Sequence, residues 1–489
     1  MASTIEESRR EVQTAFARAL TRAETVKRQS FFSFERELWT LMLELGRTLV
    51  VLFLAHQAAR PRAVDYRHGG LPWRLGGERT SELGTRFGKV SFTRVIGRRR
   101  DIRRAACDLP LDRELELCGG FSLGVVVAIT RLCAQMAFAS ARANFQETYG
   151  WRPSPRAVLR MVDAVGDEAR EFLEQAPLPD DDGEVLVIQV DGKGAPMISE
   201  REFERRCAPQ QRGEVLSGRR ARRARRRSWT RPRRTKGKKS KNAKIAVVGV
   251  LYTLKKTAEG MDGPIGKRVL ATFENYEALF IWLRREAVKR GYGRKQTVFL
   301  ADGAEHIWRL QQKYLPKAEV CIDWYHVVEK LWSAGECLYA EGSDELAQWV
   351  SKQTTRLRRG AAKAVLATLR DELARTPRQG PGNKGKRVRL QKAIDYFEMH
   401  AHRMRYKELR RQDLDIGTGA VEGAVRNLVG MRLDGPGMRW SRQRSERVLH
   451  LRCILINGQW NGFSEHLAWH DRLTLAAQPE PAQPHAAAA

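Results

Sequence analysis

The sequence lacks the features of a secreted, disulfide-stabilised or membrane-spanning protein. Its seven cysteines are scattered and include no CxxC pair, which argues against a zinc ribbon or a disulfide framework and favours a reducing cytosol. The N-terminal sequence MASTIEESRREVQ has neither an apolar signal region nor a cleavage site, so we expect no secretion. The longest apolar segment begins at Leu38 and contains Glu44 and Arg47, which favours a buried helix over a membrane span.

Negative charge is also scarce. The chain has 88 Lys and Arg residues against 57 Asp and Glu residues, for a formal net charge of +31. Such a surface gathers phosphate and releases its counterions, so the expected partner is a polyanion. Nucleic acid is the leading candidate and an acidic membrane surface is the lesser one. The 489 residues, 42% of them hydrophobic, suffice for two to four domains with cores of their own.

The N-terminal part reads as three segments. Residues 1–66 form a helical segment with apolar residues repeating on one face from Phe31 to Leu49, as in a helix-pairing or dimerisation element. Residues 67–120 form a small linker or strand module, in which the weak alternation from Lys89 to Ile96 predicts a short strand or hairpin. Residues 121–178 are helical again.

A helix-turn-helix is predicted within the third segment. One amphipathic helix runs from Phe138 to Thr148, the sequence YGWRP breaks it, and a second helix starts after Ser154 as N-cap and ends just before Gly166. This arrangement would offer Arg156 and Arg160 to a DNA groove. The alternative is an ordinary pair of packed helices.

From residue 184 onward, strands and helices alternate. Strands are expected at 185–190, 245–254, 267–273, 297–302 and 318–323, with helices at 275–290 and 304–313. Three successive strands followed by helix, strand, helix and strand is the element order of a ribonuclease H-like domain, with an antiparallel meander and two later strands parallel to the first.

The expected fold class is therefore α/β, with a ribonuclease H-like mixed sheet as catalytic core. Its first part is assigned to residues 184–325, with a basic loop at 201–244, and an all-α insertion follows at 326–415. Residues 416–464 complete the core, and residues 465–489 form a low-complexity, disordered tail.

Three acids stand where this topology would bring them together: Asp191, Asp302 and Glu422. The first two end strands that are parallel neighbours, so both would face one crevice. Phosphodiester chemistry calls for two divalent cations roughly 4 Å apart, and Mg²⁺ prefers such oxygen ligands. Singly, each acid has an ordinary alternative: a hairpin turn at Asp191, a capping box at Asp302, and the helix dipole at Glu422.

The sequence DWYH adds two further candidates, Asp323 and His326, at the end of the fifth expected strand. His326 could reach a phosphate oxygen or orient a leaving group, or could simply be a histidine that opens a helix. Lys193, close after Asp191, is similarly placed to meet phosphate, although loop lysines are usually solvated.

Basic residues between the first two strands are expected to clamp a duplex backbone without reading sequence. The run from Arg219 to Lys244 is too highly charged to pack, and its DNA-binding candidates are Arg225, Arg226, Arg227, Arg233, Arg234, Lys238 and Lys239. Beyond Glu422 the candidates are Arg426, Arg439 and Trp440. Trp440 is either a stacking platform for an unpaired base or a core residue.

The ordered motifs VDGKG (190–194), ADGAEHIW (301–308), DWYH (323–326), GTGAVEG (417–423), GMRWS (437–441) and NGQW (457–460) resemble bacterial insertion-sequence transposases of the ISKra group, within the DDE class. The resemblance covers roughly residues 80–465. It implies cleavage at transposon ends and strand transfer into a target, with Asp191, Asp302 and Glu422 as metal ligands; Asp323 and His326 match the D-x-x-H signature of the family. Relatives often carry a cysteine cluster before the helix-turn-helix, whereas this stretch offers only Cys107, so we expect no structural zinc.

The leading hypothesis is thus a DNA transposase that uses two Mg²⁺ or Mn²⁺ ions. The expected partners are double-stranded DNA, as terminal inverted repeats and as target, and further copies of the chain in a homodimer or higher oligomer, because two ends must be brought together. We expect a cytoplasmic, nucleoid-associated protein without membrane contact. The alternatives are a nuclease that cuts without joining, a domesticated DNA-binding protein without catalysis, and an RNA-binding protein with a ribonuclease H-like fold.

Overall fold

The chain divides into two compact units. The computed structural model describes residues 2–25, 28–99, 107–199, 201–203, 243–435 and 437–469. The first unit comprises Met1–Phe172 and Gly458–Ala489, and the second comprises Leu173–Asn457.

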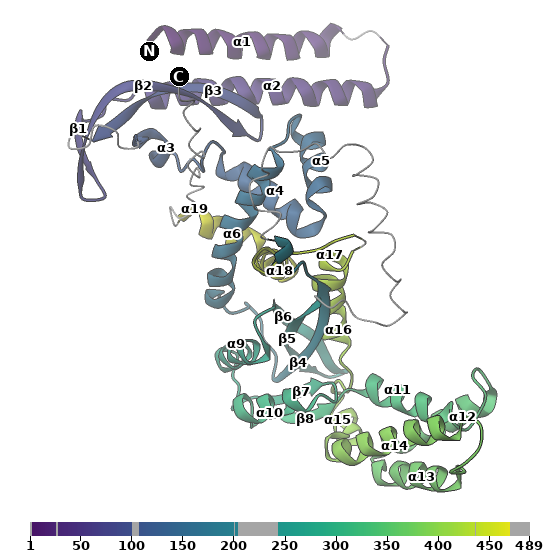
Figure 1. Cartoon of the computed structure of the whole chain (residues 1–489). Coiled ribbons are helices and arrows are strands. Elements are labelled where there is room, and N and C mark those ends of the chain that lie inside the picture. The colour runs from purple at the N-terminus through teal and green to yellow at the C-terminus, as the bar shows by residue number, and fades with distance from the viewer. Residues whose placement is uncertain are drawn as a thin grey trace, which may run out of the picture. The chain divides into compact units, whose positions relative to one another are not determined.

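Two long helices open the first unit. α1 (Ala2–Thr25) and α2 (Phe31–Ala58) lie side by side as an antiparallel pair (Figure 1), which confirms the helical periodicity of this segment. Ser30 begins α2 because its hydroxyl accepts a hydrogen bond from the amide of Ser33 at 3.2 Å. The prediction that this apolar helix is buried is wrong. It is long and apolar enough to cross a membrane, and only 6% of its most apolar 18-residue window is buried.

A three-stranded antiparallel meander follows. β1 (Asp65–His68), β2 (Leu71–Thr85) and β3 (Gly88–Arg99) pair in the order β1-β2-β3, which confirms the predicted hairpin around Lys89 to Ile96. Apolar residues from α2, β2, β3 and α3 (Pro110–Glu114) form the core beneath it, namely Leu54, Leu83, Val90, Phe92 and Leu111. The β2–β3 hairpin therefore packs on α2 along the half that is nearest to its turn.

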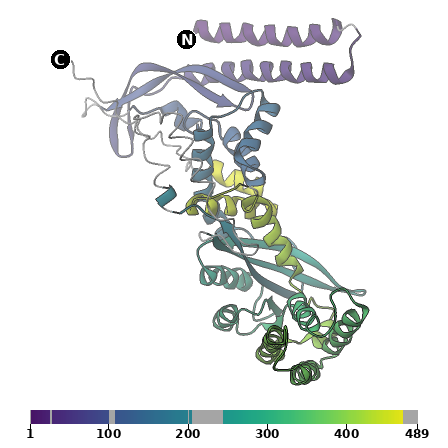
Figure 2. The same ribbon diagram turned by 45° about the vertical axis from the view of Figure 1, so that its right-hand side comes forward.

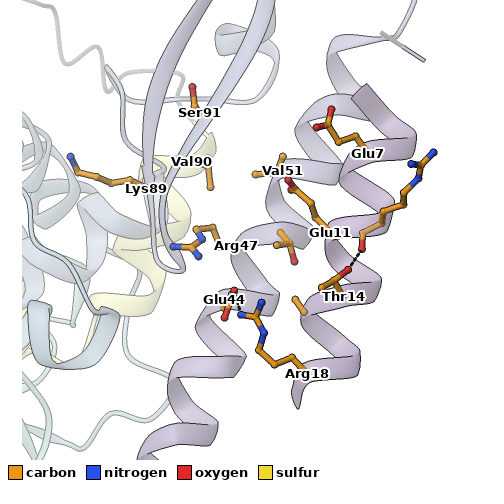
Figure 3. A pocket seen from close by; sticks show the side chains of 13 residues that line it. Glu7, Glu11, Thr14, Arg18, Glu44, Arg47, Val51, Lys89, Val90 and Ser91 are labelled. Atoms are coloured by element: carbon orange, nitrogen blue, oxygen red, sulfur yellow. Dashed lines mark hydrogen bonds and ion pairs between the residues drawn. The ribbon is translucent and has the colours of Figure 1, made fainter. Parts of the chain in front are cut away.

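A polar groove of about 580 Å³ lies between α1, α2 and β3 (Figure 3). Its charged lining residues are Glu7, Arg10, Glu11, Arg18, Glu44, Arg47 and Lys89. Arg18 and Glu44 form an ion pair across it at 2.7 Å. Because four cations face three acids, the groove has little net charge.

Four more helices belong wholly or mainly to the first unit. They are α4 (Leu123–Gln135), α5 (Phe138–Tyr149), α6 (Pro155–Gln175) and α19 (Trp460–Trp469). α6 runs straight through Gly166, so the predicted helix end there is wrong. Val162, Val165 and Ala169 are fully buried at helical spacing on either side of the glycine, and this packing outweighs its low helix propensity. α19 also corrects the expected tail, because residues 465–469 are helical.

The second unit contains a five-stranded mixed sheet. Its strands are β4 (Val185–Pro196), β5 (Ala243–Thr257), β6 (Gly260–Thr272), β7 (Gln296–Ala301) and β8 (Glu319–Ile322), in the order β6-β5-β4-β7-β8. β4, β5 and β6 are antiparallel, and β7 and β8 run parallel to β4. The meander and the two parallel strands are thus as predicted.

The predicted end of the first strand at Asp191 is wrong. Pairing of β4 with β7 stops at Val190 and Ala301, but pairing with β5 continues to Pro196. Asp191 therefore lies inside a strand, at the point where one of its two neighbours ends.

Helices cover both faces of this sheet. On one face, α9 (Tyr276–Lys289) packs Leu279 and Leu283 against Gly249, where a Cβ would lie only 3.0 Å from Leu279. On the other face lies α16 (Gly419–Val425), which contacts β4 and β5. α10 (Glu305–Tyr314) connects β7 to β8, and α16 continues through a π-helical turn (Arg426–Gly430) into α17 (Met431–Leu433), followed by α18 (Arg442–Ile456).

The predicted all-α insertion follows β8 and gathers into one bundle beside it (Figure 2). Its helices are α11 (Trp324–Gly335), α12 (Asp344–Arg358), α13 (Ala362–Arg375), α14 (Asn383–His400), a 3₁₀ turn (Ala401–Arg403) and α15 (Tyr406–Arg411). α13 and α14 are separated by residues 376–382, whose sequence TPRQGPG contains two prolines and two glycines.

A buried ion cluster holds the sheet together at the end remote from Asp191. The guanidinium of Arg290 is fully buried and donates to Asp182 at 2.5 Å and to the carbonyl of Gly266 at 2.6 Å. Thr253 and Lys295 also donate to Asp182. Burial alone would raise the pKa of Asp182, but these hydrogen bonds hold it below its ordinary value.

Asp182→Asn is expected to lower the free energy of unfolding by about 2 kcal/mol at neutral pH, because it leaves Arg290 buried without its counter-charge. The folded pKa is the lower one, so this stabilisation is present above the unfolded pKa of about 3.9 and disappears as the pH falls through the folded pKa. Urea unfolding of both proteins between pH 3 and 7 would show the difference shrinking at the acid end.

The matched control is Asp181→Asn, one residue earlier. Asp181 is exposed, and its carboxylate lies 3.6 Å from the Lys255 ammonium in a solvent-exposed ion pair. Removal of its charge should therefore change the free energy of unfolding by less than about 0.5 kcal/mol. Equal effects of the two substitutions would contradict the role assigned to Asp182.

Candidate active site

Two of the predicted acids meet where β4 and β7 part. Asp191 and Asp302 each follow a residue of the last parallel pair, Val190 and Ala301. The Asp191 carboxylate accepts from the amide of Gly192 at 2.6 Å, within a continuous strand, so it does not start a hairpin turn. Asp302 accepts from the amide of Ala304 at 2.9 Å, and Ala304 is the N-cap of α10, so the capping-box alternative also fails.

Asp323 and His326 form a hydrogen-bonded pair at the start of α11. Asp323 is fully buried and caps this helix: one carboxylate oxygen lies 2.8 Å from the His326 amide and 2.7 Å from its ring Nδ1. The other oxygen accepts from the amide of Thr418 at 2.7 Å. With Nδ1 held by Asp323, the Nε2 atom of His326 remains available to a ligand.

Glu422 approaches the same place from α16. Thr418 links it to the pair described above, because the threonine hydroxyl donates to Glu422 at 3.0 Å while its amide donates to Asp323. One potential ligand atom from each of Asp323, His326 and Glu422 lies within 4.8 Å of the others. These three groups could hold a divalent metal ion.

The electrostatics connect this cluster to the two aspartates. Burial raises the pKa of Asp191, and the negative charges of Asp302 and Glu422 raise it further, against the opposing effect of His326. The hydrogen bond to Asp323 raises the pKa of His326 to about 8, with contributions from Asp302 and Asp191. Asp191, Asp302 and Glu422 thus lie within electrostatic reach of one another, although 231 positions separate the first from the last (422 − 191).

The donor set suits a hard divalent cation. Glu422 and His326 could offer an oxygen and a nitrogen ligand, and the carboxylates of Asp191 and Asp302 could add oxygen ligands of the kind that Mg²⁺ and Mn²⁺ prefer. Asp323 already accepts three hydrogen bonds, so it fits better as the partner that orients His326 than as a ligand itself.

Sequence reasoning missed Gln189, which fastens α16 to β4. It lies two residues before Asp191, on the same face of the strand, and is buried. The side-chain oxygen of Gln189 accepts from the backbone amide of Val421 at 3.0 Å. Its side-chain NH₂ group donates to the backbone carbonyl of Gly417 at 3.3 Å and to the hydroxyl of Tyr252 at 3.1 Å. A glutamine inside an apolar strand was the available signal, because a buried amide needs partners.

Aromatic residues from two other helices lie near the two aspartates and were not predicted either. Burial raises the pKa of Tyr276 to about 12, and Asp302 and Asp191 contribute. Tyr396, on α14 of the insertion, lies against Gly303, where a Cβ would be 2.5 Å from its ring. Only glycine therefore fits beside Asp302, and the insertion packs directly on the turn that carries this acid.

The predicted DNA-binding residues have different surroundings. Lys193 is half-buried, with its Nζ 3.9 Å from Asp434, while Arg426 and Arg439 are exposed. Arg156 and Arg160 are exposed on α6. Trp440 is only 6% exposed and donates its indole N–H to the carbonyl of Leu433 at 3.0 Å, which favours the core alternative over base stacking.

The candidates in the basic run lie outside the described residues. They are Arg225, Arg226, Arg227, Arg233, Arg234, Lys238 and Lys239.

No protein-family model matches the chain, and no curated protein matches it in sequence. Among solved structures, the Drosophila P element transposase strand transfer complex is similar, with 13% sequence identity and a TM-score of 0.24. The match covers 71% of this chain and 83% of that one. The case for function therefore rests on the geometry of the chain itself.

Gln189→Leu is expected to loosen α16 from β4, because the amide of Val421 and the carbonyl of Gly417 lose a buried partner. The loss should cost about 2–3 kcal/mol of unfolding free energy. It should also speed hydrogen exchange at the Val421 amide by at least about tenfold, since 1.4 kcal/mol corresponds to a factor of ten. Mass spectrometry of deuterium uptake over residues 417–425 measures this.

Gln311→Leu serves as the control. Gln311 is a buried glutamine whose amide donates to the carbonyl of Leu315, at the end of its own helix. Its loss should affect stability but not exchange at Val421. Unchanged protection of Val421 in Gln189→Leu would show that other contacts hold α16 in place.

Proposed function

We propose that the chain is a metal-dependent DNA transposase of the DDE class, with a ribonuclease H-like core, and that it belongs with the ISKra group of insertion-sequence transposases. The observation that carries the proposal is the group formed by Asp323, His326 and Glu422, whose potential ligand atoms lie within 4.8 Å of one another. Asp191 and Asp302 are near enough to this group to raise the pKa of His326. Asp191 and Asp302 are half-buried and Glu422 is exposed. Repulsion among neighbouring carboxylates is relieved when a cation is shared, so such a group is typical of a metal site.

In this proposal Asp191, Asp302 and Glu422 would hold two Mg²⁺ or Mn²⁺ ions, which would supply activation of the attacking oxygen and stabilisation of the leaving one in phosphoryl transfer. His326, oriented by Asp323, contacts a phosphate or leaving-group oxygen, and Lys193 offers a charge to the neighbouring phosphate.

Two reactions of the same type follow at this site. Water attacks a phosphodiester at the transposon end, which breaks the P–O bond and frees a 3′-hydroxyl. That hydroxyl then attacks a target phosphodiester, so that one P–O bond forms as another breaks and a new 3′-hydroxyl leaves.

The DNA is held by basic residues around the site and in the first unit. Its net charge of +31 suits the chain to a duplex backbone. Arg156 and Arg160 of a helix-turn-helix, the run of basic residues from Arg225 to Lys239, and Arg426 and Arg439 are the proposed contacts to terminal repeats and target DNA. A homodimer or higher oligomer would bring two ends together, in the cytoplasm at the nucleoid.

Asp191→Asn and Glu422→Gln should each reduce Mg²⁺-dependent nicking of the DNA that flanks the gene by about 10³-fold or more, because they remove ligand charge. Duplex affinity measured in EDTA should be unchanged or slightly tighter. Each variant should also be as stable as the wild type without metal, since a mutual repulsion is relieved, and should gain less thermal stability on addition of Mg²⁺.

Asp262→Asn, an exposed acid on β6 of the same sheet, is the control and should behave as wild type. Nicking at the wild-type rate by either Asp191→Asn or Glu422→Gln would refute the assignment of these acids as metal ligands.

Joining separates a transposase from a nuclease. With Mg²⁺, labelled end DNA bearing a free 3′-hydroxyl should become covalently attached to an unlabelled plasmid, and denaturing gels would reveal the larger product. Cleavage without any joined product would point to a nuclease instead. Binding without cleavage would point to a DNA-binding protein without catalysis.

A further inference from the structure

The distal half of the three-stranded sheet in the first unit carries a row of arginines. We call this half, residues 65–79 and 94–99, the basic arm. It contains β1 and the parts of β2 and β3 farthest from their shared turn (Figure 1). Arg74, Arg79 and Arg98 are all exposed there.

Two of the arm's cross-strand pairs unite like charges. Arg74 lies directly opposite Arg98, and Arg79 lies directly opposite Arg94. Side chains at such positions share a face with their Cβ atoms roughly 5 Å apart, and like charges there destabilise a sheet. Asp112 supplies a counter-charge to Arg94, so the like-charge pair with no ion pair to either member among the described residues is Arg74 with Arg98.

A β-bulge keeps these arginines on one face. Gly76 and Gly77 together lie opposite the single residue Ile96, and Gly77 has a φ of +86° that favours glycine. Arg74 and Arg79 are five positions apart, so without the extra residue they would point to opposite faces. The bulge therefore aligns them.

The arm differs from the rest of the sheet in how its charges are matched. Arg94 is buried and paired with Asp112 at 2.5 Å, and Lys89 near the turn is paired with Glu82 at 2.7 Å. Among the described residues, none forms an ion pair with Arg74, Arg79 or Arg98. Two acids lie nearby. Asp65 on β1 is directly opposite Arg74 and offsets part of its charge, whereas Glu78 lies on the other face of the sheet from the arginines.

We propose that the basic arm binds the phosphate backbone of double-stranded DNA, with Arg74, Arg79 and Arg98 as the contacts. Guanidinium groups pair with phosphate in a two-pronged geometry, and phosphates between the arginines would relieve their mutual repulsion. The near-neutral groove of Figure 3 offers no such excess of positive charge. The inference deepens the proposed function, from which it takes DNA as the partner.

Arg98→Glu tests the arm without risking its fold. The substitution places a carboxylate opposite Arg74, which converts a repulsive pair into an attractive one, so the melting temperature should stay the same or rise. Both phosphate contacts should be lost, because Arg74 is then neutralised. In EDTA, we expect about tenfold weaker binding to a duplex and a slope of log K against log salt that is smaller by roughly 2.

Two further variants complete the experiment on the full-length chain. Arg79→Gln should reduce the salt slope by about 1. Arg294→Glu, at an exposed arginine before β7 in the second unit, should change neither the affinity nor the slope by as much.

Wild-type affinity and salt slope in Arg98→Glu, or an effect no larger than that of Arg294→Glu, would overturn the inference. Failure of the proposed function is a separate outcome. If the wild type never nicks DNA in Mg²⁺ but Arg98→Glu still weakens duplex binding, the arm is supported and the transposase proposal fails. If the wild type nicks and joins while Arg98→Glu binds normally, the arm inference alone fails.

Discussion

The candidate site depends on one feature of strand pairing: β7 stops at Ala301 while β4 continues. Below that point both strands are locked into the sheet by parallel hydrogen bonds. Beyond it, β7 no longer pairs with β4, and Asp191 and Asp302 each come directly after the last pair; Trp440 forms a bridge only at Met197, directly after β4. Because β5 still pairs with β4 up to Pro196, Asp191 is held on a rigid strand and not on a loop. Its carboxylate is thus held on the strand, although burial and the neighbouring negative charges raise its pKa.

A second constraint brings the third acid to this point. α16 has only seven residues, too few to be a stable helix alone. It is fixed by hydrogen bonds to buried partners: Gln189 receives the amide of Val421, and Asp323 receives the amide of Thr418. Gln189 lies on β4, and Asp323 lies between β8 and α11. The position of Glu422 is therefore determined by β4 and by the start of α11. The acids of the site therefore form one unit with the sheet.

The strands and their order could be predicted, because each strand leaves a local mark in the sequence as an apolar run. The acids that follow two of these strands could be named as candidates in the same way. What could not be predicted depends on contacts between distant residues. Gln189 is one polar residue in an apolar strand until Val421 is placed beside it. Tyr396 matters only once α14 packs on Gly303. The ends of α6 and β4 were missed for the same reason: burial of Val162 and Val165 carries the helix past Gly166, and pairing with β5 carries the strand past Asp191.

Side chains of like charge lie close together in two places, at the acids beside β4 and on the basic arm. At the sheet, carboxylates converge at a cost that a shared cation would offset. On the arm, arginines face one another at a cost that phosphate would offset. In both places the local structure holds the charges together rather than letting them separate, by a strand that continues in one case and by a glycine bulge in the other. A duplex that bridges the arginines through its phosphates also supplies phosphate oxygens of the kind that complete a Mg²⁺ coordination shell. In the proposed function, the arginines would meet the phosphates of a duplex and the acids would hold the metal ions that act on such a phosphate.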